Sequence, residues 1–229
     1  TADKGAKAVN MNPSALGAQP NSIVSGTGLT VIGTVQGIIL SKGGKVTSSG
    51  VISVPYDVNA VAITKDDKTV FAAGSDCKIH VYDTDGAALT EKHTIENATL
   101  KPITCLSISP DGSKLASGDA RDVCVFDLKA DYKVLIAKGR WCFHVQRVTC
   151  LAWAADSSLL ASGGADDSIY LWNLAKNAKR KQYRYAHRGG LTGMEFIPTS
   201  DGSLQLISAG VDSVVQKWDV TKDAKATFA

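Results

Sequence analysis

One sequence unit recurs along this chain at a nearly constant interval, and this repeat limits the possible folds more than any other feature. The unit is typified by ASGGADDSIYLWNL, which begins at Ala161. In each copy, Ile or Val comes five residues after a glycine, and three residues later comes an aromatic residue followed by Asp or Asn. The glycines lie 44, 46 and 46 residues apart: Gly74, Gly118, Gly164 and Gly210. Such a period indicates similar supersecondary units that stack to share a core.

Each copy follows two runs in which apolar and polar residues alternate, as in ITCLSISPDGSKLASG. This alternation predicts half-buried strands, and the polar residues between the runs predict tight turns. The turn residues are Asp67, Asp111-Gly112, Asp156-Ser157 and Asp201-Gly202. A variable fourth strand is expected at 45–54, 88–96, 132–137 and 181–186. No segment shows a convincing helical period, so the sequence predicts an all-β fold.

Four strands in about 45 residues that end in Trp-Asp resemble the WD-repeat β-propeller, in which each unit forms one blade. We therefore expect a WD40-type β-propeller with about five four-stranded antiparallel blades, as part of a seven-bladed ring. A weaker first unit, LTVIGTVQGIILSKGGK, aligns Gly33 with Gly74 but lacks the aromatic residue and the aspartate. The whole chain, 1–229, is one propeller portion with blades at 20–54, 55–97, 98–138, 139–186 and 187–229.

Closure of the ring leaves two alternatives for residues 1–19. The last blade has no clear fourth strand after Asp219-Val220. The segment AKAVNM (Ala6 to Met11) could supply that strand, or it could be the outer strand of a preceding blade. An open propeller exposes unpaired strand edges, and we favour a truncated piece of a seven-bladed ring. The chain starts at Thr1 rather than Met, which is typical of a fragment or a processed product.

The WD-repeat resemblance implies a structural role for the aspartate that follows each glycine. In such blades this Asp joins a hydrogen-bonded set with a His, a Ser or Thr and the Trp, so that buried donors find acceptors. The fourth and fifth blades hold every member: His144, Ser162, Asp166 and Trp172, then His187, Ser208, Asp212 and Trp218. Loss of Asp212 should therefore destabilise the fold far more than loss of Asp67. Blades 2 and 3 have Ala72, Tyr82, Ala116, Ala120 and Phe126 instead, which predicts apolar packing.

A catalytic interpretation of the same residues is weaker. His144, Ser162 and Asp166 are the residue types of an acyl-transfer triad, but the set recurs in the next blade and includes a Trp, and no G-x-S-x-G elbow is present. Asp166 and Asp167 cannot act as a glycosidase pair, because adjacent residues point apart. We expect no enzyme activity, no cofactor and no metal site.

Bulk properties exclude several classes of protein. With 25 Lys and Arg against 22 Asp and Glu, the chain lacks the strongly basic character that nucleic-acid binding requires. The uncharged run from Ser22 to Ser41 is interrupted by glycines and threonines, so we expect strands rather than a membrane span. Five cysteines without a C-x-x-C motif indicate free, mostly buried thiols in a reducing compartment.

The run RWCFHVQRVTC, followed by YAHRGGLTGMEFI, resembles the closing blades of the actin-interacting protein 1 family. The resemblance implies two tandem seven-bladed propellers, of which this chain would be most of the second. It also implies actin and cofilin as partners, disassembly of cofilin-decorated filaments, and a cytoplasmic, cytoskeletal location. A generic WD-repeat scaffold in another cytosolic complex is the alternative.

Three stretches are candidate contact surfaces. A basic run joins blades 4 and 5 and is either a solvated hairpin or a contact for acidic actin or cofilin: Lys176, Lys179, Arg180, Lys181, Arg184 and Arg188. In Arg140-Trp141-Cys142, the Trp either packs in the core or is an exposed anchor, a residue type enriched in binding hot spots. Arg121-Asp122 stands where blade 3 has lost its structural Asp, and it is either a contact surface or the result of simple drift.

Overall fold

A computed structural model describes residues 18–48, 50–197, 199 and 202–228. It contains five antiparallel sheets, which follow one another in chain order. We call them blades 1 to 5. Blade 1 has five strands, β1 (Pro20–Ser25), β2 (Leu29–Thr34), β3 (Gly37–Lys42), β4 (Lys45–Val46) and β5 (Ile52–Ser53), of which the last two both pair with β3.

Blades 2, 3 and 4 each have four strands, and blade 5 has three. Blade 2 comprises β6 (Val58–Ile63), β7 (Thr69–Gly74), β8 (Ile79–Thr84) and β9 (Leu89–Ile95). Blade 3 comprises β10 (Cys105–Ile108), β11 (Lys114–Gly118), β12 (Val123–Asp127) and β13 (Lys133–Ile136). Blade 4 comprises β14 (Val148–Trp153), β15 (Leu159–Gly164), β16 (Ile169–Asn173) and β17 (Arg180–Tyr183). Blade 5 comprises β18 (Leu191–Ile197), β19 (Gln205–Gly210) and β20 (Val215–Asp219).

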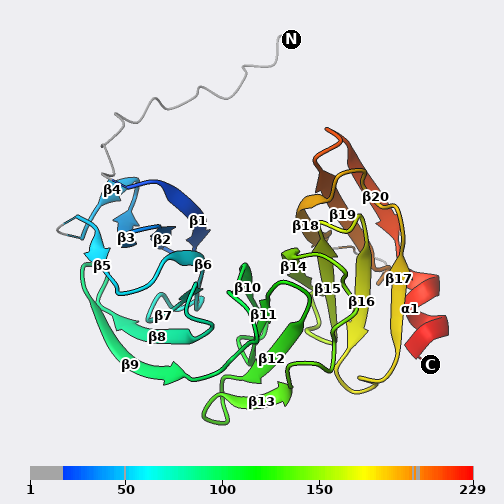
Figure 1. Ribbon diagram of the computed structural model, residues 1–229, viewed down its shortest axis with the longest axis horizontal. Helices are drawn as coiled ribbons and strands as arrows, with labels where there is room; N and C mark the ends of the chain where they lie inside the picture. The colour runs from blue at the N-terminus through cyan, green and yellow to red at the C-terminus, as the bar shows by residue number, and fades with distance from the viewer. Residues whose placement is uncertain (1–17, 49, 198, 200–201, 229) are drawn as a thin grey trace.

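The blades stand around a common axis, which Figure 1 views end on. The first strand of each blade is innermost, and β1, β6, β10, β14 and β18 contact one another in that order. Between β1 and β18 the arc is open in this view (Figure 1). The strand expected at Ala6–Met11 and the turn residue Asp201 lie outside the described residues.

Four apolar cores fill the spaces between the five blades. One lies between each pair of neighbours, as around Val31 and Val61 for blades 1 and 2, and around Val125 and Leu160 for blades 3 and 4. The aromatic residue of the repeat enters these cores: Phe126 and Trp172 are almost fully buried. A single twisted sheet cannot bury such side chains by itself, so the stacking of blades is what excludes water from them.

Polar contacts tie the first turns of neighbouring blades together. Asp67, in blade 2, accepts hydrogen bonds from the backbone N–H of Thr27 (2.9 Å) and Gly28 (2.7 Å) in blade 1. The backbone N–H of Asp111, in blade 3, donates to Ser157 Oγ in blade 4. Asp67 therefore joins two blades as well as forming its own turn, a contact that its position in the repeat did not reveal.

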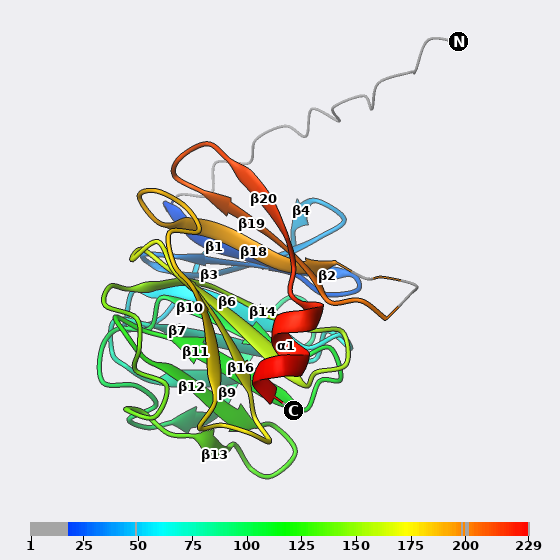
Figure 2. The same cartoon turned by 90° about the vertical axis from the view of Figure 1, so that its right-hand side faces the viewer.

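The chain also forms a helix, α1 (Thr221–Phe228), where we expected none. Val220, Ala224 and Phe228 recur at intervals of four residues and are buried in the core between blades 4 and 5. Asp223 accepts hydrogen bonds from Lys181 Nζ (3.1 Å) and Tyr183 Oη (2.8 Å) on β17. Figure 2 looks onto the side that carries α1. The signal is only eight residues long, too short for a helical period to stand out against the strands before it.

We expect Phe228→Ala to lower the free energy of unfolding by about 2–4 kcal/mol, because the ring is buried and an isolated helix of this length is not stable without packing. The control is Lys222→Ala on the exposed side of α1, which should change stability by less than about 0.5 kcal/mol. Urea denaturation followed by tryptophan fluorescence measures both. Equal stabilities for the two variants would show that α1 contributes nothing to the core.

Candidate functional site

In blade 4, four side chains form one buried hydrogen-bonded chain. Trp172 Nε1 donates to Ser162 Oγ (2.8 Å), Ser162 Oγ lies 2.9 Å from His144 Nε2, and His144 Nδ1 lies 3.0 Å from Asp166 Oδ1. An indole N–H only donates and a carboxylate only accepts. The directions at the two ends follow: the indole donates to the serine oxygen, and His144 Nδ1 donates to Asp166.

Blade 5 repeats this arrangement nearer the solvent. Trp218 Nε1 donates to Ser208 Oγ (2.8 Å), which lies 2.7 Å from His187 Nε2, and His187 Nδ1 lies 3.0 Å from Asp212 Oδ1. The Asp212 side chain is 19% exposed, against 3% for Asp166. Water therefore competes more strongly for the last bond in blade 5 than in blade 4.

These networks do not form hydrolytic triads. The side chains of His144 and Ser162 are completely buried, so no substrate can reach the hydroxyl. Trp172 also occupies the serine oxygen as a donor. Burial raises the pKa of the Asp166 carboxyl, but hydrogen bonds from His144 and from the backbone N–H of Val145 and Ser168 outweigh it, and the pKa lies below its usual value.

Blade 2 replaces the network with a different polar cluster, not with the apolar packing that we expected. His80 on β8 lies 2.8 Å from Asp76 Oδ2 through Nε2 and 2.9 Å from Glu91 Oε1 through Nδ1. Its ring stacks on that of Tyr56, with centroids 4.2 Å apart, and Tyr56 Oη is 2.9 Å from Tyr82 Oη. Both ring nitrogens therefore face carboxylate oxygens, which accept hydrogen bonds.

The small residue at position 72 explains why blade 2 has this cluster in place of the usual network. Ala72 pairs with His80 across β7 and β8, where the repeat would place a serine, and the histidine comes from the third strand rather than from a loop. In blade 3, Ala116 and Phe126 do pack in an apolar environment, as expected.

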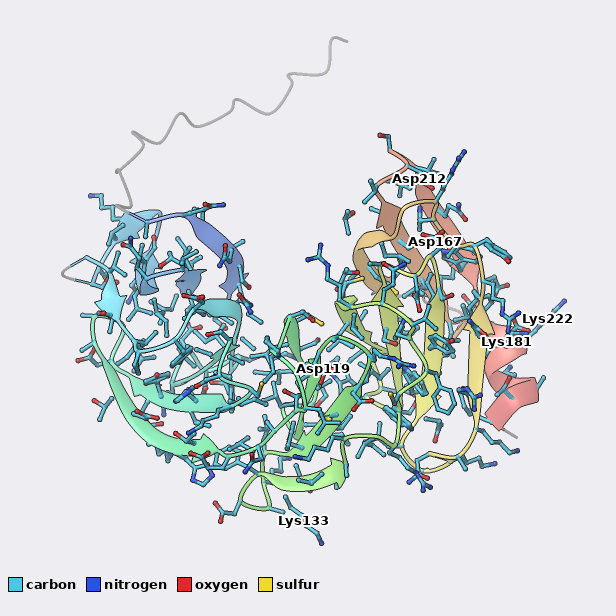
Figure 3. All side chains as sticks on the ribbon, in the orientation of Figure 1. Asp119, Lys133, Asp167, Lys181, Asp212 and Lys222 are labelled. Carbon is cyan, nitrogen blue, oxygen red and sulfur yellow. The ribbon has the colours of Figure 1, made fainter. Side chains whose placement is uncertain are left out.

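Arg121 and Asp122 of blade 3 have structural contacts, and drift does not account for them. Asp119, one position before the usual place, accepts hydrogen bonds from the backbone N–H of both residues at 2.8 Å. Arg121 Nε donates to the His144 carbonyl (3.1 Å), and Asp122 Oδ2 accepts from Gly139 N–H (2.9 Å). Figure 3 labels Asp119, together with Asp167 and Asp212 on the corresponding turns of blades 4 and 5.

Trp141 belongs to the core, and its interpretation as an exposed anchor is wrong. The side chain is 1% exposed, its ring stacks on Trp172 at 4.8 Å, and Nε1 donates to the Asn177 carbonyl (2.9 Å). Beside it, Arg140 is exposed and Nη2 donates to Asn177 Oδ1 (2.9 Å). The hairpin after β16 therefore packs onto the loop before β14.

The structure separates the basic run into residues with different roles. Lys181 is held by Asp223, and Arg180 lies over the Phe143 ring, 3.5 Å from its centroid. Lys179, Arg180 and Arg188 belong to exposed positions of the hairpin and of the following loop. Arg140, Phe143, Lys179 and Arg180 line a cavity of about 240 Å³. We call the three cationic residues of this lining, Arg140, Lys179 and Arg180, the cationic rim. The rim links the loop before β14 to the basic run between blades 4 and 5.

Tyr185 is an exposed aromatic residue that sequence analysis did not select. Its side chain is 86% exposed, and its backbone has a φ of 58°, which is unusual for a residue with a bulky side chain. A hydrogen bond of 2.7 Å from Ala186 N–H to the Asp167 carbonyl fixes the adjacent peptide. In the sequence, the feature that could have pointed to Tyr185 is an aromatic residue within the basic run, between Arg184 and His187.

All five cysteines are free. Cys124 is buried and the other four are partly exposed, so the thiols are less enclosed than we expected. Burial raises the pKa of the Cys105 and Cys124 thiols to about 12. Thiolates at these positions are therefore scarce near neutral pH.

Comparison with known proteins identifies the repeats. The WD40 family model (WD domain, G-beta repeat) matches residues 47–83, 90–127 and 139–173. Among solved structures, the chain resembles U3-55K with a TM-score of 0.62 and 24% identity, over 72% of this chain and 49% of that one. Both comparisons agree with the sheet topology in assigning a WD40 β-propeller fold.

Curated relatives are similar over most of this chain. The 66 kDa stress protein of Physarum polycephalum is 30% identical over 208 residues, which is 90% of this chain and 33% of the relative. Actin-interacting protein 1 of Caenorhabditis elegans is 29% identical over 213 residues, again 90% of this chain and 33% of the relative. Actin-interacting protein 1-2 of Arabidopsis thaliana is 29% identical over 81% of this chain. The chain spans about a third of the length of these relatives.

Among the residues that the structure describes, no helix has the length and apolar character needed to cross a lipid bilayer.

We expect Asp166→Ala to lower the free energy of unfolding by about 2 kcal/mol or more, because it leaves the buried His144 ring nitrogen without an acceptor. Asp156→Ala is the matched control, since that carboxylate is exposed and bonds only to Ser158 in its own turn. It should cost less than about 1 kcal/mol. Chemical denaturation of the three proteins measures both differences, and equal losses would contradict a buried network.

The effect of Asp166→Ala should also depend on pH. A carboxyl whose pKa is lowered by folding stabilises the protein above its unfolded pKa, and this stabilisation disappears as the pH falls through the folded pKa. The stability deficit of the variant should therefore be largest at neutral pH and shrink below about pH 4. A deficit that stays constant from neutral to acidic pH would assign it to lost packing alone.

Proposed function

Because this chain is a WD40-repeat β-propeller protein related to actin-interacting protein 1, we propose that it binds actin filaments that carry cofilin and promotes their disassembly. The similarity to relatives with that name over 81–90% of the chain is the observation that carries the proposal. The name states that those proteins interact with actin. Since the chain spans only about a third of each relative, the activity of the whole relative is part of the proposal rather than a finding.

The cationic rim of blade 4 favours an acidic partner. Residues 129–188 contain eleven Lys and Arg against four Asp and Glu, although the whole chain has 25 against 22. One of those four carboxylates, Asp166, is buried in the blade 4 network. The positive charge is therefore concentrated on one part of the arc. Such a surface steers an acidic protein toward blades 4 and 5 and fixes its orientation.

The cationic rim also has an aromatic component, because Arg180 lies over the ring of Phe143. Arg180 lies over a ring that is 37% exposed, and Arg140 lines the same cavity. Arginine and aromatic side chains are enriched in protein interfaces. We therefore assign the filament contact to Arg140, Lys179 and Arg180, which line this cavity. Arg188, in the loop before β18, stays a candidate as part of the basic run, and we treat Lys181 as a structural residue because it is paired with Asp223.

We expect the double variant Lys179→Glu, Arg180→Glu to pellet with cofilin-decorated filaments at least about tenfold more weakly than the unchanged chain. Lys42→Glu, Lys45→Glu is the control, because it makes the same change in net charge at exposed positions of blade 1. High-speed cosedimentation over a range of filament concentrations measures binding. Light microscopy of labelled filaments measures disassembly.

The outcomes of these assays distinguish the proposed function from the proposed binding surface. If the unchanged chain neither pellets with cofilin-decorated filaments nor accelerates their disassembly, the proposed function is wrong. If it does both, and the rim variant behaves like the blade 1 control, the function stands and the assignment of the cationic rim is wrong.

A further inference from the structure

A polar cavity of about 450 Å³ lies at the inner ends of the blades, on the axis of the arc. All five blades contribute to its wall, from Asn21 in blade 1 to Val211 in blade 5. Blades 4 and 5 supply the charged and apolar part of its lining: Arg147, Val148, Gly189, Gly190, Leu191 and Val211. Neither the repeat nor the proposed filament contact uses this cavity.

Most polar groups of the wall already hold neighbouring blades together. Asn21 Nδ2 donates to the Val58 carbonyl (3.1 Å), and Asn59 Nδ2 donates to the Ile103 carbonyl (3.0 Å). Thr104 Oγ1 donates to the Val148 carbonyl (2.6 Å). These bonds join successive inner strands, so this part of the wall is fixed and its donors are occupied.

Arg147 differs from these residues. It is exposed, and its guanidinium makes no hydrogen bond or ion pair within the described part of the chain, although its carbonyl accepts from Ala165 N–H. The carboxylates of the surrounding loops are engaged in holding those loops: Asp166 bonds to His144, Asp167 Oδ1 accepts from Gly189 N–H (2.9 Å), and Asp212 bonds to His187. Five donors of a fixed positive charge are thus left for a ligand.

An apolar side chain borders the same space. Val211 lines the cavity and is 63% exposed, and its backbone N–H donates to the Gly190 carbonyl (3.0 Å). An exposed valine and an unpaired arginine on one cavity wall form a combination of apolar and charged contacts that suits a protein side chain better than a bare ion.

The backbone at this point is held in one conformation. Gly190 has a φ of +99°, and a Cβ at this position would lie 2.8 Å from the Ala165 Cα. The loop before β18 therefore packs directly against the turn between β15 and β16. A rigid wall lowers the entropy cost of ordering the site when a ligand binds.

We propose that this part of the cavity, which we call the Arg147 site, binds a carboxylate side chain from an acidic segment of a partner protein. The carboxylate pairs with the Arg147 guanidinium, and an adjacent apolar side chain of the same segment packs on Val211. A polyphosphate chain is less suited to the site, because a single unpaired arginine flanked by valine cannot neutralise a run of phosphates. The inference does not depend on actin.

Fluorescence anisotropy with a short labelled peptide of Glu and Asp residues around a single Leu tests the proposal. We expect the unchanged chain to bind this peptide, and Arg147→Glu to weaken binding at least about tenfold. Lys133→Glu makes the same change in net charge on β13, at the outer edge of blade 3 (Figure 3), and should weaken binding less than about twofold. Val211→Asp should also lose binding, whereas Val134→Asp, its control on β13, should retain it.

Hydrogen exchange locates the peptide independently of these variants. We expect slower amide exchange at residues 189–192 and 209–211 when the peptide is bound. Absence of peptide binding, equal weakening by Arg147→Glu and Lys133→Glu, or displacement of the peptide by an equimolar single-stranded oligonucleotide would each overturn the proposal. The filament assay is read separately: filaments that fail to bind any version of the chain contradict the proposed function only.

Discussion

Burial of one blade by the next is the condition on which the rest of this structure depends. Each sheet has apolar residues on both faces, and only stacking around the axis removes both from water. The four cores between blades supply this burial, while hydrogen bonds from Asn21, Asn59 and Thr104 fix the distance between inner strands. Apolar packing thus provides most of the driving force, and the polar contacts select one arrangement of blades.

Blades 2 to 5 have the same structural requirement and meet it with different contacts. Each must hold the loop before its first strand against the turn between its second and third strands. Blades 4 and 5 do so with a Trp–Ser–His–Asp chain, and blade 3 with Asp119, which accepts from the backbone N–H of Lys101. In blade 2, His80 bonds to Asp76 in the turn and stacks on Tyr56 in the loop. Because these connections stiffen the loops on one side of the arc, the exposed residues that those loops carry are presented on a rigid support.

The sequence predicted the strands of the repeat, because period-two alternation and fixed spacing are local signals. The two complete networks were predicted by the resemblance to WD-repeat blades. It could not predict that His80 of blade 2 replaces the usual histidine, since that depends on the pairing of Ala72 with His80. The burial of Trp141 depends on Trp172 and Asn177, more than thirty residues away. The Arg147 site was also hidden, because its lining comes together only when the inner strands surround the axis.

The helix that folds back from blade 5 onto blade 4 has a consequence for the outer edge of blade 5. Because α1 leaves the sheet instead of continuing as a fourth strand, no described strand pairs with the outer edge of β20. An uncovered edge is a template on which another molecule can add a strand. Lys217 and Asp219 are exposed on β20, and burying charges of both signs in such an association is unfavourable. The short length of β20 and its charged residues are features that disfavour the pairing of another strand with this edge.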